Sequence, residues 1–249
     1  MRIVSVPCLK DNFAYLVIDG GRCAVVDPGE AAPVEAALAR EQVELTAVWA
    51  THHHHDHVGG IPELIGRRSG VEVVIGEVDA PRTPRTTRTV RDGDEVALGS
   101  LRARCILNPG HTLGAVTFVV DGCAFTGDTL FGAGCGRLFE GDAAMMHASL
   151  MRLAALPPET KVYFGHEYTA ANLRFAAAVE PDNAAIQRRA GALRAATPST
   201  PSTMADECAT NPFLRAAEPA VIAAAVARGA AGDPVSVFAA IRSWKDGFR

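Results

Sequence analysis

The chain has 249 residues, of which 48% are hydrophobic and 21% are charged, so it has the composition of a soluble globular protein and the length to bury a sizeable core. Its formal net charge of −4 argues against a nucleic-acid partner, which would require a basic field over one face. No window approaches the roughly 18 uninterrupted apolar residues of a membrane span, so we expect no membrane partner either.

The first two-thirds of the chain contains short β-rich segments separated by Gly, Pro and Asp. Residues 1–7 alternate as a strand does and lack the apolar run of a secretory signal. Segments 13–18 and 23–26 flank Asp19-Gly20-Gly21-Arg22, a turn sequence that predicts a hairpin. Further strands are predicted for 45–50, 71–75, 101–107, 115–120, 123–125 and 161–164, with a second hairpin turn at Asp121-Gly122. Helical spacing predicts helices for 33–40 and 143–156.

After about Thr169 the chain changes to alanine-rich segments without a β-rich run, and these segments predict helices. They cover residues 170–179, 183–196, 219–228 and 234–243, with a proline-containing break at 198–201. We therefore predict an α+β protein with two parts, a β-rich domain in residues 1–168 and a small all-helical domain in residues 169–249.

The cysteines are scattered and form neither a CxxC pair nor a compact framework. A chain of this length has no need of a disulfide scaffold, so we expect reduced thiols and a cytoplasmic location. The six positions are Cys8, Cys23, Cys105, Cys123, Cys135 and Cys208.

Seven of the eight histidines lie in three short segments, and each segment follows a predicted strand. The first is a His-x-His-x-Asp-His motif that runs from His52 to His57, the second contains His111, and the third contains His166. Between the last two segments, Asp128 follows another apolar strand. Loops that follow strands can bring such side chains into one shared cleft.

Imidazole and carboxylate groups are ligands of zinc, iron and manganese. A single tetrahedral ion cannot use all of the candidate ligands, so they predict two metal sites that share one carboxylate. The candidates are His52, His54, Asp56, His57, His111, Asp128 and His166.

This set resembles the metal signature of the metallo-β-lactamase superfamily, whose fold is an αββα sandwich. The resemblance implies one ion held by His52, His54 and His111, and a second ion held by Asp56, His57 and His166. It also implies that Asp128 bridges the two divalent ions, which we expect to be Zn²⁺, with iron or manganese as alternatives.

Other residues near this motif are expected to lie outside the ligand set. His53 and His55 alternate away from the ligand positions, so we interpret them as surface residues or as residues that support the ligands. His147 lies in a predicted helix, and we interpret it as a surface or packed residue. Asp27 lies in a turn that resembles a superfamily element near the metals, and we expect it to support a ligand without binding metal.

Two divalent ions offset by two carboxylates leave a net charge of about +2, which lowers the pKa of a water between them. The expected nucleophile is therefore a metal-bridging hydroxide. Asp56 is the expected catalytic residue, because it would orient this hydroxide as well as bind the second ion. Such a site needs no Ser or Cys nucleophile.

The fold alone does not select a substrate, because the superfamily supports many reactions. Residues 127–131, 134–141, 165–169, 201–203, 211–215 and 242–246, with Asn172 and Glu207, resemble the hydroxyacylglutathione hydrolase (glyoxalase II) family. The resemblance implies that the helical domain binds glutathione. It further implies hydrolysis of S-(2-hydroxyacyl)glutathione, with S-D-lactoylglutathione giving glutathione and D-lactate, the second step of methylglyoxal detoxification.

The same resemblance implies contacts to the glutathione moiety by Arg137, Phe139, Tyr168, Arg242 and Lys245. The three cations suit the two carboxylates of the tripeptide. Phe139 departs from the family, in which a tyrosine is common, so one hydroxyl contact would be missing. His55 likewise stands where a bulky aromatic residue is common.

The alternatives are a lactonase or β-lactamase of the same superfamily, and a persulfide dioxygenase, a redox enzyme that uses one iron. The helical domain and Lys245 argue against all three. A nuclease would need a basic RNA-binding surface, and a non-catalytic metal-binding module would not explain the glutathione pocket. We expect a monomer that acts on a small glutathione thioester.

Overall fold

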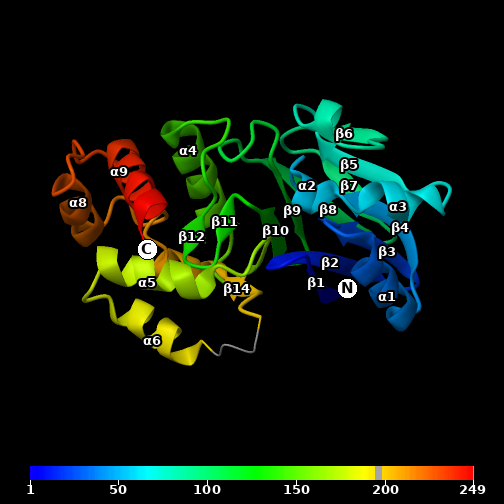
Figure 1. Ribbon diagram of the computed structural model, residues 1–249, viewed down its shortest axis with the longest axis horizontal. Coiled ribbons are helices and arrows are strands. Elements are labelled where there is room, and N and C mark those ends of the chain that lie inside the picture. The colour runs from blue at the N-terminus through cyan, green and yellow to red at the C-terminus, as the bar shows by residue number, and fades with distance from the viewer. Residues whose placement is uncertain (194–197, 249) are drawn as a thin grey trace.

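The structure, a computed structural model, describes residues 1–193 and 198–248, and within them two six-stranded sheets face each other (Figure 1). The first sheet has the order β1 (Arg2–Cys8), β2 (Asn12–Asp19), β3 (Arg22–Val26), β4 (Glu44–Trp49), β5 (Glu72–Gly76) and β6 (Arg88–Val90). The second has the order β14 (Ser202–Thr203), β13 (Lys161–Phe164), β10 (Cys123–Gly127), β9 (Val116–Val120), β8 (Leu101–Leu107) and β7 (Glu95–Leu98). A short ribbon pairs β11 (Leu130–Phe131) with β12 (Gly134–Cys135).

Helices cover the outer faces of both sheets (Figure 1). Those near the N-terminal half are α1 (Ala31–Glu41), α2 (His55–Val58) and α3 (Ile61–Gly66). The later ones are α4 (Ala143–Ala154), α5 (Thr169–Val179), α6 (Ala184–Ala192), α7 (Met204–Thr210), α8 (Pro219–Val226) and α9 (Pro234–Gly247). None of the helices in the described ranges is both long and apolar enough to cross a membrane.

The layers follow from the alternation of buried side chains along the strands. In β2, Leu16 faces the core under α1 and α3, whereas Tyr15 and Val17 face the space between the sheets. The two inner faces meet where Trp49 of β4 stacks on Phe118 of β9, with ring centroids 5.5 Å apart. Both faces of each sheet are therefore buried, and the predicted αββα sandwich is confirmed.

Both predicted hairpins form as their turn sequences indicate. Asp121 and Gly122 have φ of 46° and 72°, which is the left-handed pair that a two-residue turn between right-twisted strands requires. This turn pairs Val120 of β9 with Cys123 of β10. The turn at Gly20-Gly21 likewise joins β2 to β3 in antiparallel register.

In the described residues after 168 the regular elements are helices, apart from β14, which pairs with β13 at the edge of the second sheet. The helix predicted for 183–196 ends at Ala192, and residues 194–196 of that prediction lie outside the described ranges. This region shares one core with the sheet, because Phe175, Phe213 and Phe238 belong to the same buried cluster as Phe164 of β13. The C-terminal helices are thus docked by a large apolar contact.

Candidate metal centre

The candidate ligands lie in loops that follow the carboxyl ends of four strands. The histidine motif follows β4 in the first sheet, whereas His111, Asp128 and His166 follow β8, β10 and β13 in the second. Strands β10 and β13 are parallel neighbours, so their carboxyl ends lie side by side. Gly127, with φ of 49°, packs against Thr51 so closely that a side chain would collide, and this contact brings the Asp128 loop to the histidine motif.

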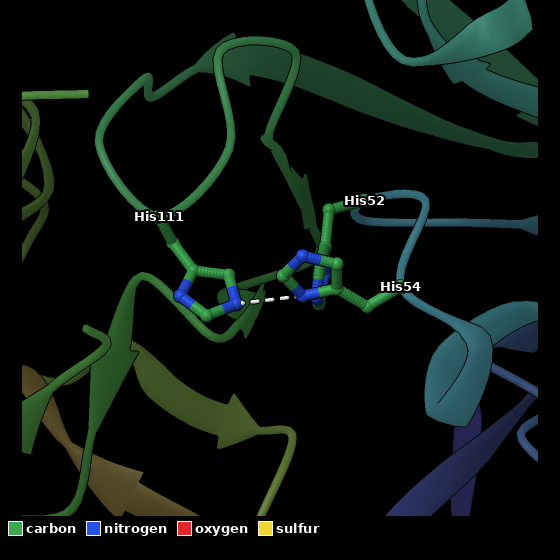
Figure 2. A group of neighbouring side chains, drawn as sticks. All are labelled: His52, His54 and His111. Atoms are coloured by element: carbon green, nitrogen blue, oxygen red, sulfur yellow. Dashed lines mark hydrogen bonds between the residues drawn. The ribbon is translucent and has the colours of Figure 1, made fainter. Parts of the chain in front are cut away.

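The first group of ligand atoms consists of three imidazole nitrogens that point toward one another from two loops (Figure 2). His54 Nδ1 lies 3.1 Å from His52 Nε2 and 3.0 Å from His111 Nε2. Metal–nitrogen bonds of about 2.0–2.1 Å in a tetrahedron would place such nitrogens about 3.3 Å apart. A metal ion fits this spacing with only a small outward shift of the three rings.

The second group consists of Asp56, His57 and His166. The Nε2 atoms of His57 and His166 lie 3.4 Å apart, and Asp56 Oδ2 lies 3.8 Å and 3.3 Å from them. Asp128 lies between the groups: its Oδ1 is 3.2 Å from His57 Nε2, and its Oδ2 is 3.3 Å from His166 Nε2 and 3.5 Å from His111 Nε2. Oδ1 of Asp128 is buried and has no hydrogen-bond partner. A buried oxygen without a partner is free to bind a metal ion.

Contacts behind the rings leave their inward nitrogens free. The Nδ1 atoms of four histidines meet oxygens at 2.8–3.1 Å, namely His52 with Thr51 Oγ1, His57 with Asp27 Oδ2, His111 with the Arg137 carbonyl, and His166 with Asp11 Oδ1. Such contacts fix the tautomer and the ring orientation of a metal ligand. Asp27 also accepts hydrogen bonds from the Thr51 N–H at 2.7 Å and hydroxyl at 2.6 Å. Its oxygens are thus used in support, as expected.

The two groups differ in electrostatics. Burial lowers the pKa of His52 well below its ordinary value and that of His54 to about 4, so both rings are neutral, as a metal ligand must be. Burial also lowers the pKa of His57, but the carboxylates of Asp128 and Asp27 have the larger effect and raise this pKa well above its ordinary value. Asp128 and Asp56 likewise overcome burial and raise the pKa of His166 to about 10. The second group therefore stabilises positive charge, which suits a cation.

The other histidines lie outside both groups. His53 points to Asp79, with Nδ1 2.9 Å from Oδ2, and His55 is exposed. His147 packs against Phe238, with ring centroids 6.0 Å apart. The His/Asp clusters support a divalent metal site. A further cluster joins Asp27 to His52 and His57, but the oxygens of Asp27 already contact Thr51 and His57 Nδ1.

All five predicted glutathione contacts line one cleft of about 530 Å³ that has the metal groups at one end. Phe139 is 62% exposed, and its ring centroid lies 5.6 Å and 5.2 Å from those of His54 and His111. Tyr168 stacks on His166 with ring centroids 4.8 Å apart. Aromatic rings therefore form the walls next to the metal groups.

The basic end of the cleft is built on α9, which Asp233 caps and Pro234 begins. Arg242 is buried, donates from Nη1 to the Cys135 carbonyl at 2.9 Å, and pairs through Nη2 with Asp246 at 3.0 Å, while its Nε has no partner. Burial, with the nearby guanidinium group of Arg242, lowers the pKa of Lys245.

Sequence reasoning missed several residues of this site. Asn12 donates to Asp56 Oδ2 at 3.0 Å, and Asp11 and Asp79 support histidines. Asp246 and Cys135 also line the cleft beside Arg242, in the segments 242–246 and 134–141 that the sequence had singled out without giving these two residues a role. Asn12, Asp11 and Asp79 have neither a metal-ligand spacing nor a motif, so only their place in the fold reveals them.

Two family models match consecutive parts of the chain. The model of the metallo-β-lactamase superfamily matches residues 10–166, and the model of the hydroxyacylglutathione hydrolase C-terminus matches residues 167–248. The curated hydroxyacylglutathione hydrolases of Alkalilimnicola ehrlichii and Fuscovulum blasticum are each 50% identical to this chain, over 254 and 256 residues. These alignments cover 98% and 100% of this chain, and 98% and 99% of the two relatives.

Solved structures share the fold. ETHE1 from Myxococcus xanthus has a TM-score of 0.68 and 27% identity, with 98% of this chain and 90% of that chain covered. TTHA1623, determined in a di-iron-bound form, has a TM-score of 0.64 and 27% identity, with 86% and 100% covered. The BLEG-1 B3 metallo-β-lactamase, at 22% identity, has a TM-score of 0.67, with 86% and 99% covered.

Proposed function

The chain belongs to the hydroxyacylglutathione hydrolase family of the metallo-β-lactamase superfamily, and from this membership we propose how its residues hydrolyse the thioester of S-(2-hydroxyacyl)glutathione. The observation that carries the proposal is that one cleft is lined by residues of both metal groups and by three cationic residues, two of them on α9. The full-length relatives carry the name of a thioester hydrolase. A lactonase or a persulfide dioxygenase is not favoured, because the hydrolase relatives match both parts of the chain.

Two divalent ions are proposed, with Zn²⁺ first on ligand type and iron or manganese as alternatives. His52, His54 and His111 would hold one, Asp56, His57 and His166 the other, and Asp128 would contact both. Such ions would supply Lewis acidity at the thioester carbonyl and lower the pKa of a bound water toward about 7. TTHA1623, which shares the fold, was determined in a di-iron-bound form, and this supports a pair of ions and iron as an alternative to zinc.

Asp56 is the residue that we propose to orient the attacking water. Its Oδ2 faces His166 and receives a hydrogen bond from Asn12, so the carboxylate has a fixed direction at the mouth of the metal site. The side chain is partly exposed, unlike Asp128, so it can contact a water that enters from the cleft. A carboxylate in this place can accept a hydrogen bond from the water and so direct the lone pair of the water oxygen at the carbonyl carbon.

The glutathione moiety would extend from the metal site toward α9. Arg137, Arg242 and Lys245 suit its carboxylates, and the rings of Phe139 and Tyr168 would bound the carbon chain. A domain of residues 169–249 would thus contribute Lys245 and Arg242, whereas residues 1–168 would contribute the chemistry. Phe139 offers ring contacts but no hydroxyl, so substrate orientation depends more on the cations.

The remaining parts of the proposal concern the cell. We propose a cytoplasmic monomer with no nucleic-acid or membrane partner and with S-D-lactoylglutathione as substrate. The cysteines support a reducing location, because all six are free, and all but Cys208 are buried.

Purified protein should hydrolyse S-D-lactoylglutathione, followed as loss of thioester absorbance, and a chelator should abolish this turnover. Added Zn²⁺ should restore it, and metal analysis should give two ions per chain. Fully metallated protein without turnover would reject the substrate, whereas turnover that survives complete metal removal would reject the metal mechanism.

Substituting Lys245 with alanine should raise KM about tenfold and leave kcat nearly unchanged, because a charged hydrogen bond worth about 1.5–3 kcal/mol is lost far from the reacting carbonyl. The matched control is Lys161→Ala, at the exposed amino end of β13, away from the cleft. An unchanged KM for Lys245→Ala would argue against a glutathione pocket at α9. Steady-state kinetics at several substrate concentrations separates the two constants.

A further inference from the structure

The carboxylate of Asp79 is fully buried between the two loops that carry the first histidine group. Its Oδ2 accepts hydrogen bonds from the His53 N–H at 3.2 Å and from the Thr112 hydroxyl at 2.8 Å. Its Oδ1 accepts from the Gly114 N–H at 3.0 Å. His53 lies between two of the proposed ligands, and Thr112 follows the third. One side chain therefore joins the two loops from which the first group is assembled.

Two further side chains contact this carboxylate. His53 Nδ1 lies 2.9 Å from Asp79 Oδ2, and Arg82 Nη2 lies 3.4 Å from Oδ1. Arg82 also pairs with Glu140, whose Oε2 accepts a hydrogen bond from the Leu113 N–H at 2.9 Å. The loop that follows His111 is thus held by two carboxylates, of which Asp79 is the inner one.

The packing leaves no freedom for this carboxylate. A side chain at Gly114 would collide with Asp79, and one at Gly76 would collide with the Gly114 carbonyl. The turn after β5 and the loop after β8 therefore approach each other closely, and the Asp79 side chain packs directly against Gly114. A longer or displaced side chain at residue 79 would push the two loops apart.

We propose that Asp79 is a positioning residue that sets the spacing of His52, His54 and His111 and hence the affinity of the first metal site, an inference that depends on the proposed metal assignment. It does not act on the second group, since His57 and His166 are supported by Asp27 and Asp11, and Asp56 by Asn12. Contacts of this kind typically change metal affinity about 10–100-fold when they are lost. We therefore expect weaker binding of only one of the two metal ions.

The test is competition of the metallated protein with a chelator, with release of each Zn²⁺ followed separately. Asp79→Asn should weaken one ion about 10–100-fold and leave the other nearly unchanged. A His54→Ala variant, which lacks a ligand of the first group, identifies which release step belongs to that group. Asp19→Asn is the matched control, because Asp19 also joins two loops, through Ser100 at 2.7 Å and 2.8 Å, but far from the ligands.

Thr112→Val gives a milder second variant, since it removes one donor to Asp79 and preserves the volume of the side chain. It should weaken the same ion several-fold, with the fold intact by thermal denaturation. Equal weakening of both ions, or unchanged affinity in both variants, would overturn the proposal. Metal release needs no substrate, so a wild-type protein that binds two ions but fails to hydrolyse the thioester would reject the proposed function and leave this inference standing.

Discussion

Asp128→Asn is expected to lower thioester turnover on the order of 10³-fold or more and to remove bound metal from the protein. The oxygens of Asp128 approach the inward-facing nitrogens of histidines from both groups, at 3.2–3.5 Å from His57, His111 and His166. Asparagine keeps the shape, but it supplies one oxygen in place of two, and its NH₂ group cannot bind a cation. One metal site would lose its ligand oxygen, and the loss of the negative charge would weaken binding at the other.

The measurement combines metal analysis of the purified variant with turnover of S-D-lactoylglutathione at saturating Zn²⁺. The control is Asp121→Asn, at the hairpin turn before β10, where an exposed residue has φ of 46° and asparagine is well tolerated. This control should keep full metal content and activity. Full metal content and ordinary turnover in Asp128→Asn would instead show that this carboxylate is no ligand.

Part of the site was predictable because its residues carry a local pattern. The His-x-His-x-Asp-His spacing, with single residues after three more strands, pointed to the histidines and to Asp56, which the structure gathers in two clusters, whereas the approach of Asp27 to His52 and His57 came only from the fold. The fold followed for a related reason: segments such as β2 and β9 have strong strand composition, and Asp121-Gly122 requires a tight turn.

The supporting residues were not predictable, because their role depends on neighbours that are distant in sequence. Asp79 contacts Thr112 and Gly114 only after two loops from different sheets have met, and Asp11 reaches His166 over more than 150 residues. Short strands were not predicted for another reason. Strand β6 has three residues and β14 has two, so neither shows a periodicity, and pairing with a longer neighbour makes them strands.

The shared core changes how the C-terminal region should be tested. Phe175, Phe213 and Phe238 lie in one buried cluster with Phe164 and Val162 of β13, so removing the region after residue 168 would expose a large apolar surface. A truncated chain is therefore expected to aggregate, and its loss of activity would say nothing about glutathione. Single substitutions at the junction between the helices and the cleft are more informative.

Glu207 of α7 lies at the junction between the helices and the cleft. It is fully buried, and its Oε1 accepts from Arg189 and from the Ser202 hydroxyl, both at 2.6 Å. Its Oε2 accepts from the Ala133 N–H at 2.8 Å and from Asn211 at 3.2 Å. Ala133 has φ of 53° in the turn between β11 and β12, a conformation that needs support in a residue with a side chain. Glu207 thus fixes the ribbon that leads to the cleft.

Glu207→Ala should lower the free energy of unfolding by about 3–5 kcal/mol, because it leaves the Arg189 guanidinium and three further donors without their acceptor. For a chain of this size we expect Tm to fall by about 10 °C, measured by thermal denaturation at fixed metal content. The control Glu63→Ala removes an exposed ion pair with Arg67 and should change stability by less than about 1 kcal/mol.

The same variant should also raise KM for the thioester, because the β11–β12 ribbon continues into Cys135 and Arg137 at the cleft. Binding of the second metal ion should remain close to that of the wild type, since the ribbon supports the first group only, through the contact of the Arg137 carbonyl with His111 Nδ1. A Tm equal to that of the wild type would show that the buried carboxylate is dispensable. A lower Tm with unchanged KM would separate stability from substrate binding and place the glutathione contacts entirely on α9 and Tyr168.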